Sequence, residues 1–215
     1  MNENIINNEQ NLSIKSRLVN FYEKNKFLVY LTLISIIVLI IFSFFYIKNK
    51  ENEQMLLAEN YIDAKIFLEN GEENKAKKKL KDIIMANDST YSTLALFLLL
   101  NENLTVDQKE TSELFDYILK NNKFEKELEN LIIFKKALFQ SNFINESELL
   151  KVISPLTSSD SIWKSHALLL LGDYFFSKNQ YLKGKEFYTK VLSLKNLHNS
   201  IYDYAQSQLI LINNE

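Results

Sequence analysis

One stretch of 21 residues without a charge, residues 27–47, constrains this chain more than any other feature of its sequence. At about 1.5 Å of rise per residue, a helix of this length is about 31 Å long and matches the hydrocarbon core of a bilayer. Lys24 and Lys26 precede the stretch, and Lys48 and Lys50 follow it. A buried core helix rarely runs this long without a polar face. The stretch therefore predicts a transmembrane helix.

The flanks of the stretch indicate how it is inserted. It is longer than the apolar region of a cleaved signal peptide, and no small-x-small cleavage site follows it, so we expect an uncleaved signal anchor. Four basic residues, among them Lys15 and Arg17, precede it, whereas two lysines follow closely. The positive-inside rule then keeps residues 1–26 in the cytoplasm as a polar tail and sends residues 48–215 across the membrane.

Composition narrows the fold of the remaining chain. Three Gly, one Pro and no Cys among 215 residues exclude disulfide scaffolds, thiolate metal sites and a lipoprotein anchor. So few turn-forming residues also disfavour a many-turned β-sandwich or barrel. The net charge of −2 leaves no nucleic-acid footprint. With 47% hydrophobic residues and few helix breakers, we expect an all-α protein.

Apolar residues at three- and four-residue steps predict about nine helices after the apolar stretch. Their expected ranges are 52–70, 72–87, 90–103, 107–121, 124–141, 146–156, 161–178, 181–195 and 200–212. Gly71 is placed to cap the first of them. Capping boxes are expected at Thr105 with Gln108 and at Asn145 with Glu148. No Gly or Pro stands between residues 27 and 70 to interrupt a helix that runs from the apolar stretch into the first of these segments.

The helices after the apolar stretch pair into hairpins that repeat. The first pair carries Ala64, Phe67, Ala76, Leu80 and Ile83, and the last pair carries Gly172, Phe175, Gly184, Tyr188 and Val191 at the same offsets. The two sets lie 108 residues apart, which equals three periods of 36. Small residues let the two helices of a hairpin approach closely, and larger ones fill the gaps beside them. The middle pairs, 90–121 and 124–156, lack the small residues, so their register stays open.

This pattern resembles the tetratricopeptide repeat family. The consensus sites fall on Leu168, Leu171, Gly172, Phe175, Gly184 and Tyr188 in the last hairpin. The resemblance implies an α-solenoid of about four hairpins with a C-terminal capping helix. The layout of tail, anchor and repeat domain, and the stretch 167–192 above all, is similar to the YfgM-like ancillary subunits of the bacterial SecYEG translocon. That similarity implies an inner-membrane protein with a periplasmic repeat domain that binds translocon subunits, periplasmic chaperones or exported polypeptides.

No motif for catalysis, cofactor binding or metal binding is present. The sequences GxGxxG, GxxxxGK[ST], HExxH and GxSxG are all missing. The two histidines, His166 and His198, stand 32 residues apart without a partnered acidic pattern. We therefore expect no enzyme, no cofactor and no small-molecule substrate. A membrane-anchored enzyme without a recognisable motif is the alternative from a different class.

Function is then expected from a surface. In stacked hairpins the first helix of each pair lines a concave groove. The register of the family places on that face Tyr61, Lys65 and Leu68 of the first pair and His166, Leu169, Asp173 and Phe176 of the last. Aromatic side chains with a few charges suit the capture of a polypeptide, although Leu169 and Phe176 are equally suited to packing between repeats. Two further alternatives stay open: a cytosolic receptor for precursor proteins with reversed topology, and self-association through an uncapped repeat face.

Overall fold

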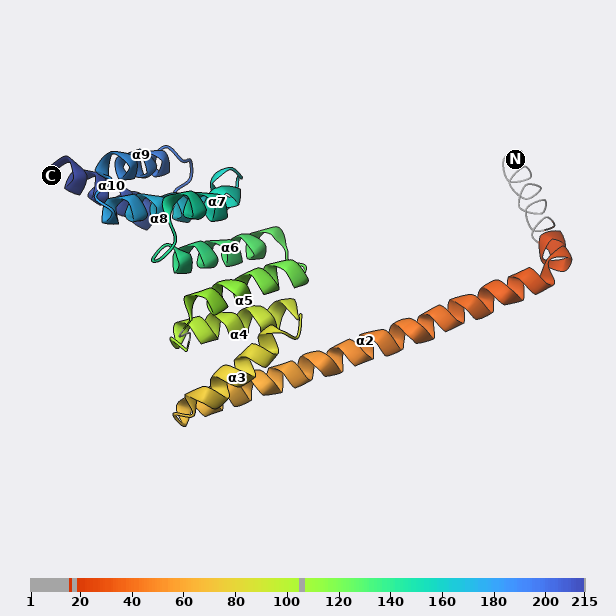
Figure 1. The fold of residues 1–215 in the computed structure, drawn as a ribbon. Coiled ribbons are helices and arrows are strands. Elements are labelled where there is room, and N and C mark those ends of the chain that lie inside the picture. The colour runs from red at the N-terminus through yellow and green to blue at the C-terminus, as the bar shows by residue number, and fades with distance from the viewer. Residues whose placement is uncertain (1–15, 17–18, 105–106, 215) are drawn as a thin grey trace, which may run out of the picture. The chain divides into compact units, whose positions relative to one another are not determined.

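The computed structural model describes Ser16, residues 19–104 and residues 107–214, and none of these residues lies in a β-strand (Figure 1). The all-α prediction is confirmed. The chain divides into two compact units, Met1–Leu56 and Leu57–Glu215.

Helix α2, Lys26–Glu69, is 44 residues long. In the described part of the chain it is the one helix long and apolar enough to cross a membrane, and none of its most apolar 18-residue window is buried. The helix continues past the apolar stretch into the segment expected at 52–70. Side-chain pairs one turn apart support its polar part, since Lys48 pairs with Glu51 and Asn49 donates to Glu53 at 3.2 Å.

The second unit contains the C-terminal part of α2 and a series of shorter helices (Figure 1). These are α3 (Glu73–Ile84), α4 (Ser89–Asn101), α5 (Gln108–Asn121), α6 (Lys126–Gln140), α7 (Glu146–Thr157), α8 (Lys164–Ser177), α9 (Tyr181–Leu192) and α10 (Asn199–Asn214). Each end agrees with the predicted range within three residues. From α3 onward every helix packs against the next in the chain, and α8 also packs against α6 and α10. This is the arrangement of a helical repeat region.

Turn-forming residues end the first helix of three hairpins in the same way. Gly71 (φ 75°), Asn103 (φ 50°) and Asn179 (φ 58°) have left-handed backbones. At Gly71 the amide of Glu72 donates to the carbonyl of Phe67 at 2.8 Å, and matching bonds follow at Leu104 and Gln180. These are Schellman motifs, in which Gly, or Asn as the next best residue, avoids the strain of positive φ. The prediction of a cap at Gly71 is confirmed.

The helix starts test the two predicted capping boxes. At α7 the box is confirmed, because Asn145 and Glu148 exchange side chain–backbone hydrogen bonds at 3.0 and 3.2 Å. At α5 the prediction is wrong, because Asp107 occupies the N-cap position and its carboxylate accepts from the amide of Lys109 at 2.8 Å. Gln108 is then the first helical residue and does not stand at the third position that a capping box requires. Thr105 lies outside the described residues.

Three apolar clusters form the core of the second unit. The first joins the end of α2 to α3, α4, α5 and α6, the second joins α6, α7 and α8, and the third joins α8, α9 and α10. The buried residues of the repeat signature are Ala64, Ala76, Leu80, Leu168, Leu171, Gly172, Phe175, Gly184 and Tyr188. Phe67 is half-buried under the ammonium of Lys75, 5.5 Å from its ring centroid, and Gly71 is exposed. The clusters succeed one another along the chain, as neighbour-to-neighbour packing of repeats requires.

The last hairpin shows why glycines stand at two of these positions. A Cβ on Gly172 would lie 2.5 Å from a ring carbon of Tyr188, whose side chain is fully buried. A Cβ on Gly184 would lie 3.3 Å from the carbonyl oxygen of Gly172. The two glycines therefore let α8 and α9 approach more closely than side chains would allow.

Candidate functional site

The first helices of the hairpins repeat one surface pattern. Each carries a buried residue, Ala64, Leu96, Ala137 or Gly172, and the residues one, four and five positions later are half-buried or exposed. These twelve residues are Lys65, Leu68 and Glu69; Phe97, Leu100 and Asn101; Leu138, Ser141 and Asn142; and Asp173, Phe176 and Ser177. We call them the groove face. The register of the middle hairpins, which the sequence left open, follows from this burial pattern.

A pocket lies where two of these sets meet. It has a volume of about 320 Å³ and is lined by Phe97, Leu100, Asn101, Lys135, Leu138, Phe139, Ser141 and Asn142. We call it the central pocket. Six of its eight lining residues belong to the groove face at equivalent positions of α4 and α6. Its apolar wall is held in place by the core, because the ring centroids of Phe139 and the fully buried Phe115 lie 6.2 Å apart.

The rim of the central pocket is polar and carries one cation. The ammonium of Lys135 stands 6.0 Å from the ring centroid of Phe97. The next residue, Lys136, forms an ion pair with Asp116 of α5 at 2.6 Å, whereas Lys135 forms no ion pair with any residue that the structure describes. Asn101 and Asn142 add amide groups to the rim, and no described carboxylate lines the pocket. The pocket thus combines apolar walls with a positive edge.

A smaller hollow of about 250 Å³ lies between α2 and α4. It is lined by Lys65, Leu68, Glu69, Leu98 and Glu102, and so joins one cation to two carboxylates. Two of the predicted groove residues, Lys65 and Leu68, therefore come together here. The third, Tyr61, packs against the first core cluster, and burial raises the pKa of its hydroxyl.

The groove residues predicted in the last hairpin have neighbours within the repeat region. Asp173 accepts hydrogen bonds from the hydroxyls of Tyr188 (2.6 Å) and Tyr204 (3.0 Å), which ties α8 to α9 and α10. Burial, followed by the bond to Asp173, raises the pKa of Tyr188, and burial together with the charge of Asp173 raises the pKa of Tyr204 to about 12. Phe176 packs edge-on against Tyr181 at 5.4 Å, and Leu169 packs on the third core cluster. These side chains therefore stabilise the hairpin and its packing against α10.

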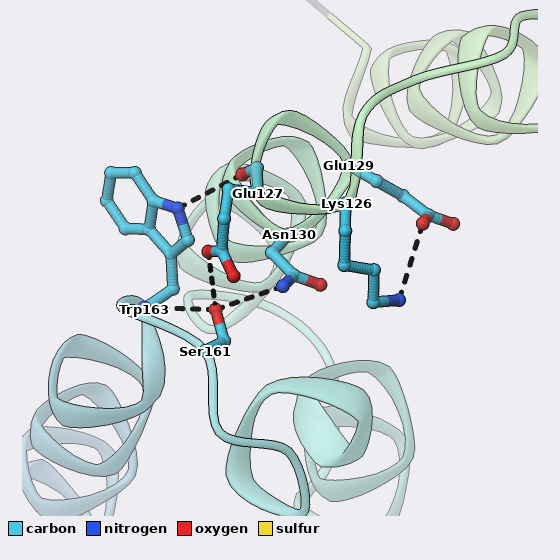
Figure 2. Close-up of polar contacts among 6 residues, drawn as sticks. All are labelled: Lys126, Glu127, Glu129, Asn130, Ser161 and Trp163. Carbon is cyan, nitrogen blue, oxygen red and sulfur yellow. Dashed lines mark hydrogen bonds and ion pairs between the residues drawn. The ribbon is translucent and has the colours of Figure 1, made fainter. Parts of the chain in front are cut away.

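A polar joint connects α6 to the start of α8, and Figure 2 shows its side chains. The Ser161 hydroxyl donates to the Glu127 carboxylate at 2.9 Å and accepts from the Asn130 amide at 3.0 Å and from the backbone N–H of Trp163 at 3.1 Å. The Trp163 indole N–H donates to the carbonyl of Glu127 at 3.1 Å. The Trp163 ring also stacks on Phe134, with centroids 5.7 Å apart. Trp163 therefore packs between hairpins, as its place near a helix start suggests.

The two histidines, far apart in sequence, line one cleft. Its volume is about 730 Å³, and it lies between the start of α8 and the connection from α9 to α10. His166 packs against the rings of Trp163 and Phe134, and burial lowers its pKa. His198 Nδ1 lies 2.8 Å from the Ser200 hydroxyl at the start of α10. Among the described residues no three His, Asp or Glu side chains are placed to hold a metal ion.

Sequence reasoning missed the central pocket because neither middle hairpin carries two small residues at the twelve-residue spacing that sets the register: Ala137 of α6 is followed by Leu149. A usable signal was present at the helix ends. Lys65, Phe97 and Asp173 each stand six residues before a turn-forming residue, Gly71, Asn103 or Asn179. Counting back from Asn103 would have placed Phe97 on the groove face. Leu138 could not be found in this way, because the residue six positions later is Ile144 and no described residue in the turn after α6 has a positive φ.

No protein-family model, no curated protein and no solved structure matches this chain. The structure itself defines the class: an all-α protein in which one N-terminal helix, long and apolar enough to span a membrane, is followed by a helical repeat region.

Proposed function

We propose that this chain is a single-pass membrane protein whose repeat region binds polypeptides on its groove face. The central pocket carries the proposal, since equivalent positions of two successive first helices form an apolar hollow with a polar rim. Interfaces that capture a peptide commonly combine an apolar anchor site with surrounding polar groups. Binding rather than catalysis also agrees with a sequence that contains no catalytic motif.

A more detailed part of the proposal concerns the membrane in which the protein lies, its orientation and its binding partners. The basic residues before the apolar stretch favour a cytoplasmic N-terminus and an exported repeat region. The similarity to YfgM-like translocon subunits adds the bacterial inner membrane as the location. It also adds translocon subunits, periplasmic chaperones and exported polypeptides as the partners. On this proposal the protein holds such partners beside the translocon and needs no cofactor.

Topology is tested by labelling one introduced thiol. The chain has no Cys, so Ser177→Cys places a single reactive group on an exposed position of the repeat region. A membrane-impermeant maleimide is added to sealed vesicles of either orientation. We expect labelling from the non-cytoplasmic side alone. Labelling from the cytoplasmic side would reverse the topology and favour a receptor for precursor proteins.

Binding is tested by photo-crosslinking in intact membranes. The photoreactive residue benzoylphenylalanine replaces Leu138 in the central pocket or, as the control, Leu182 on α9. Both leucines are exposed, at 41% and 85%, so neither substitution disturbs the core. We expect exported polypeptides, chaperones or translocon subunits to crosslink at Leu138 and not at Leu182. Equal crosslinking at both positions would argue against a groove-face site.

A further inference from the structure

The central pocket carries a charge preference as well as an apolar one. Its neighbour on the same face, the hollow between α2 and α4, contains two carboxylates and one lysine. The central pocket instead contains one lysine and, among its described lining residues, no carboxylate. The lining residues of the two hollows therefore differ in the sign of their net charge, although both hollows border α4.

Lys135 is the source of this difference. Its neighbour Lys136 already has a partner in Asp116, but the charge of Lys135 faces the pocket edge beside Phe97. A carboxylate brought to this edge would meet the ammonium and the amide groups of Asn101 and Asn142. An arriving cation would meet repulsion without a compensating carboxylate.

Size and shape limit what enters the apolar part. A volume of about 320 Å³ lies at the lower end of the range of about 300–1,000 Å³ that ligand pockets cover. The walls come from Phe97, Leu100, Leu138 and Phe139, which suit one large apolar side chain. Since groove-face residues also line the hollow between α2 and α4, a segment within a polypeptide fits better than a free chain end.

We propose that the central pocket binds a polypeptide segment in which a large apolar side chain stands next to an aspartate or glutamate. The apolar side chain enters between α4 and α6, and the neighbouring carboxylate pairs with Lys135. This inference rests on the proposed function and specifies the sequence that the groove face selects.

The test uses the full chain in detergent micelles and synthetic peptides of equal length with blocked ends. Each labelled peptide is Gly/Ser-rich and carries at its centre Phe–Glu, Phe–Gln, Phe–Lys or Ser–Glu; binding is followed by fluorescence anisotropy. We expect Phe–Glu to bind most tightly, Phe–Gln about two- to fivefold more weakly, and Phe–Lys more weakly again. High salt should reduce the difference between Phe–Glu and Phe–Gln. Ser–Glu should lose at least about tenfold, because no large side chain is buried.

Two pairs of variants separate the charge from the apolar contact. Lys135→Gln should make Phe–Glu and Phe–Gln bind equally. Lys120→Gln on α5, with the same change in net charge, should leave Phe–Glu the tighter binder of the two. Leu138→Ser should weaken the three Phe peptides about tenfold without changing the charge of the pocket, whereas Leu182→Ser on α9 should not weaken them. The emission of Trp163, the single tryptophan, verifies that each variant is folded.

The outcomes distinguish this inference from the proposed function. If the three Phe peptides bind equally and remain sensitive to Leu138→Ser, the charge preference is overturned and the polypeptide site stands. If no peptide binds, both proposals fail. Tighter binding of a peptide that ends in Phe with a free carboxylate would overturn the assignment to an internal segment. If Leu138→Ser instead halves the mass of the solubilised protein, a second copy of the chain occupies the pocket and the inference is overturned.

Discussion

The first and last hairpins of the repeat region solve the same packing problem with different residues. In the last, Gly172 leaves room for the fully buried ring of Tyr188. In the first, the equivalent positions carry Ala64 and Leu80, both fully buried. A larger side chain on one helix is thus matched by a smaller one on the other. The residue that a repeat position requires is therefore set by its partner across the hairpin, and the two must be changed together.

The largest expected effect comes from giving the last hairpin the branched residue of the first. Tyr188→Leu removes ring atoms from a fully buried site and leaves Asp173 with only the Tyr204 hydroxyl of its two partners. We expect the free energy of unfolding to fall by about 3 kcal/mol, from the cavity and the lost hydrogen bond. Urea unfolding of the chain in micelles, followed by the fluorescence of Trp163, measures the change. A loss below about 1 kcal/mol would mean that the ring contributes little to packing.

The joint between α6 and α8 differs from both hairpins because its interior is polar. Ser161→Ala removes three hydrogen bonds at once and leaves Asn130, which is 1% exposed, without a partner for its amide N–H groups. We expect a loss of about 2 kcal/mol in the free energy of unfolding, measured in the same way.

Asn130→Leu provides the matched control for Ser161→Ala. The side-chain oxygen of Asn130 is buried and lacks a hydrogen-bond partner in the described structure. Replacing the amide by an apolar group of similar size removes that cost together with the bond to Ser161, so this variant should be less destabilised than Ser161→Ala. If Asn130→Leu destabilises the protein more than Ser161→Ala does, the side-chain amide of Asn130 forms stronger hydrogen bonds than the structure indicates.

A smaller effect tests the match between positions 172 and 188 directly. Gly172→Ala should cost about 1 kcal/mol in the natural chain, because overpacking against the Tyr188 ring exceeds the gain in helix propensity. In a chain that already carries Tyr188→Leu, the same substitution should stabilise by up to about 1 kcal/mol, since only the propensity gain remains. Ala64→Gly in the first hairpin is the control and should destabilise by about 1 kcal/mol. If Gly172→Ala changes the free energy of unfolding in the same direction in both chains, the residues at positions 172 and 188 are not matched in size.

The predictable and unpredictable parts of this molecule differ in the range of the interactions that determine them. The helix ranges follow from apolar periodicity and the caps at Gly71 and Asn145, which are local in sequence. The central pocket depends on the register between α4 and α6, and neither helix carries a glycine that fixes it. The role of Asp173 was also not foreseeable, because Tyr204 lies 31 residues away on a helix whose packing the pattern does not specify. Asp107 was missed because Thr105 offered a competing cap two residues earlier.

The smallest effect separates the two hairpins by their response to alkali. Around Asp173 of the last hairpin, the pKa of Tyr204 on α10 is raised to about 12 and that of Tyr188 on α9 is also raised, from an ordinary value of 10.0. The unfolded chain therefore releases these protons first. The stability that the two hydroxyls contribute is complete below pH 10 and falls as the pH rises above 10, and the part from Tyr204 is lost as the pH passes 12. The first hairpin has Lys65 and Leu80 at the positions of Asp173 and Tyr188, so the pKa of its Tyr61 is raised by burial alone, without a carboxylate partner.

Tyr204→Phe isolates this contribution. The variant should lose about 1 kcal/mol near neutral pH, because one hydrogen bond to Asp173 is absent. Between pH 10 and 11 its stability should then fall less steeply than that of the natural chain, since one late-titrating group has been removed. Absorbance at the tyrosinate band should show one fewer tyrosine that ionises well above the ordinary pKa of 10.0. If Tyr204 ionises near its ordinary pKa in the folded chain, the tie to Asp173 is too weak to distinguish the last hairpin from the first.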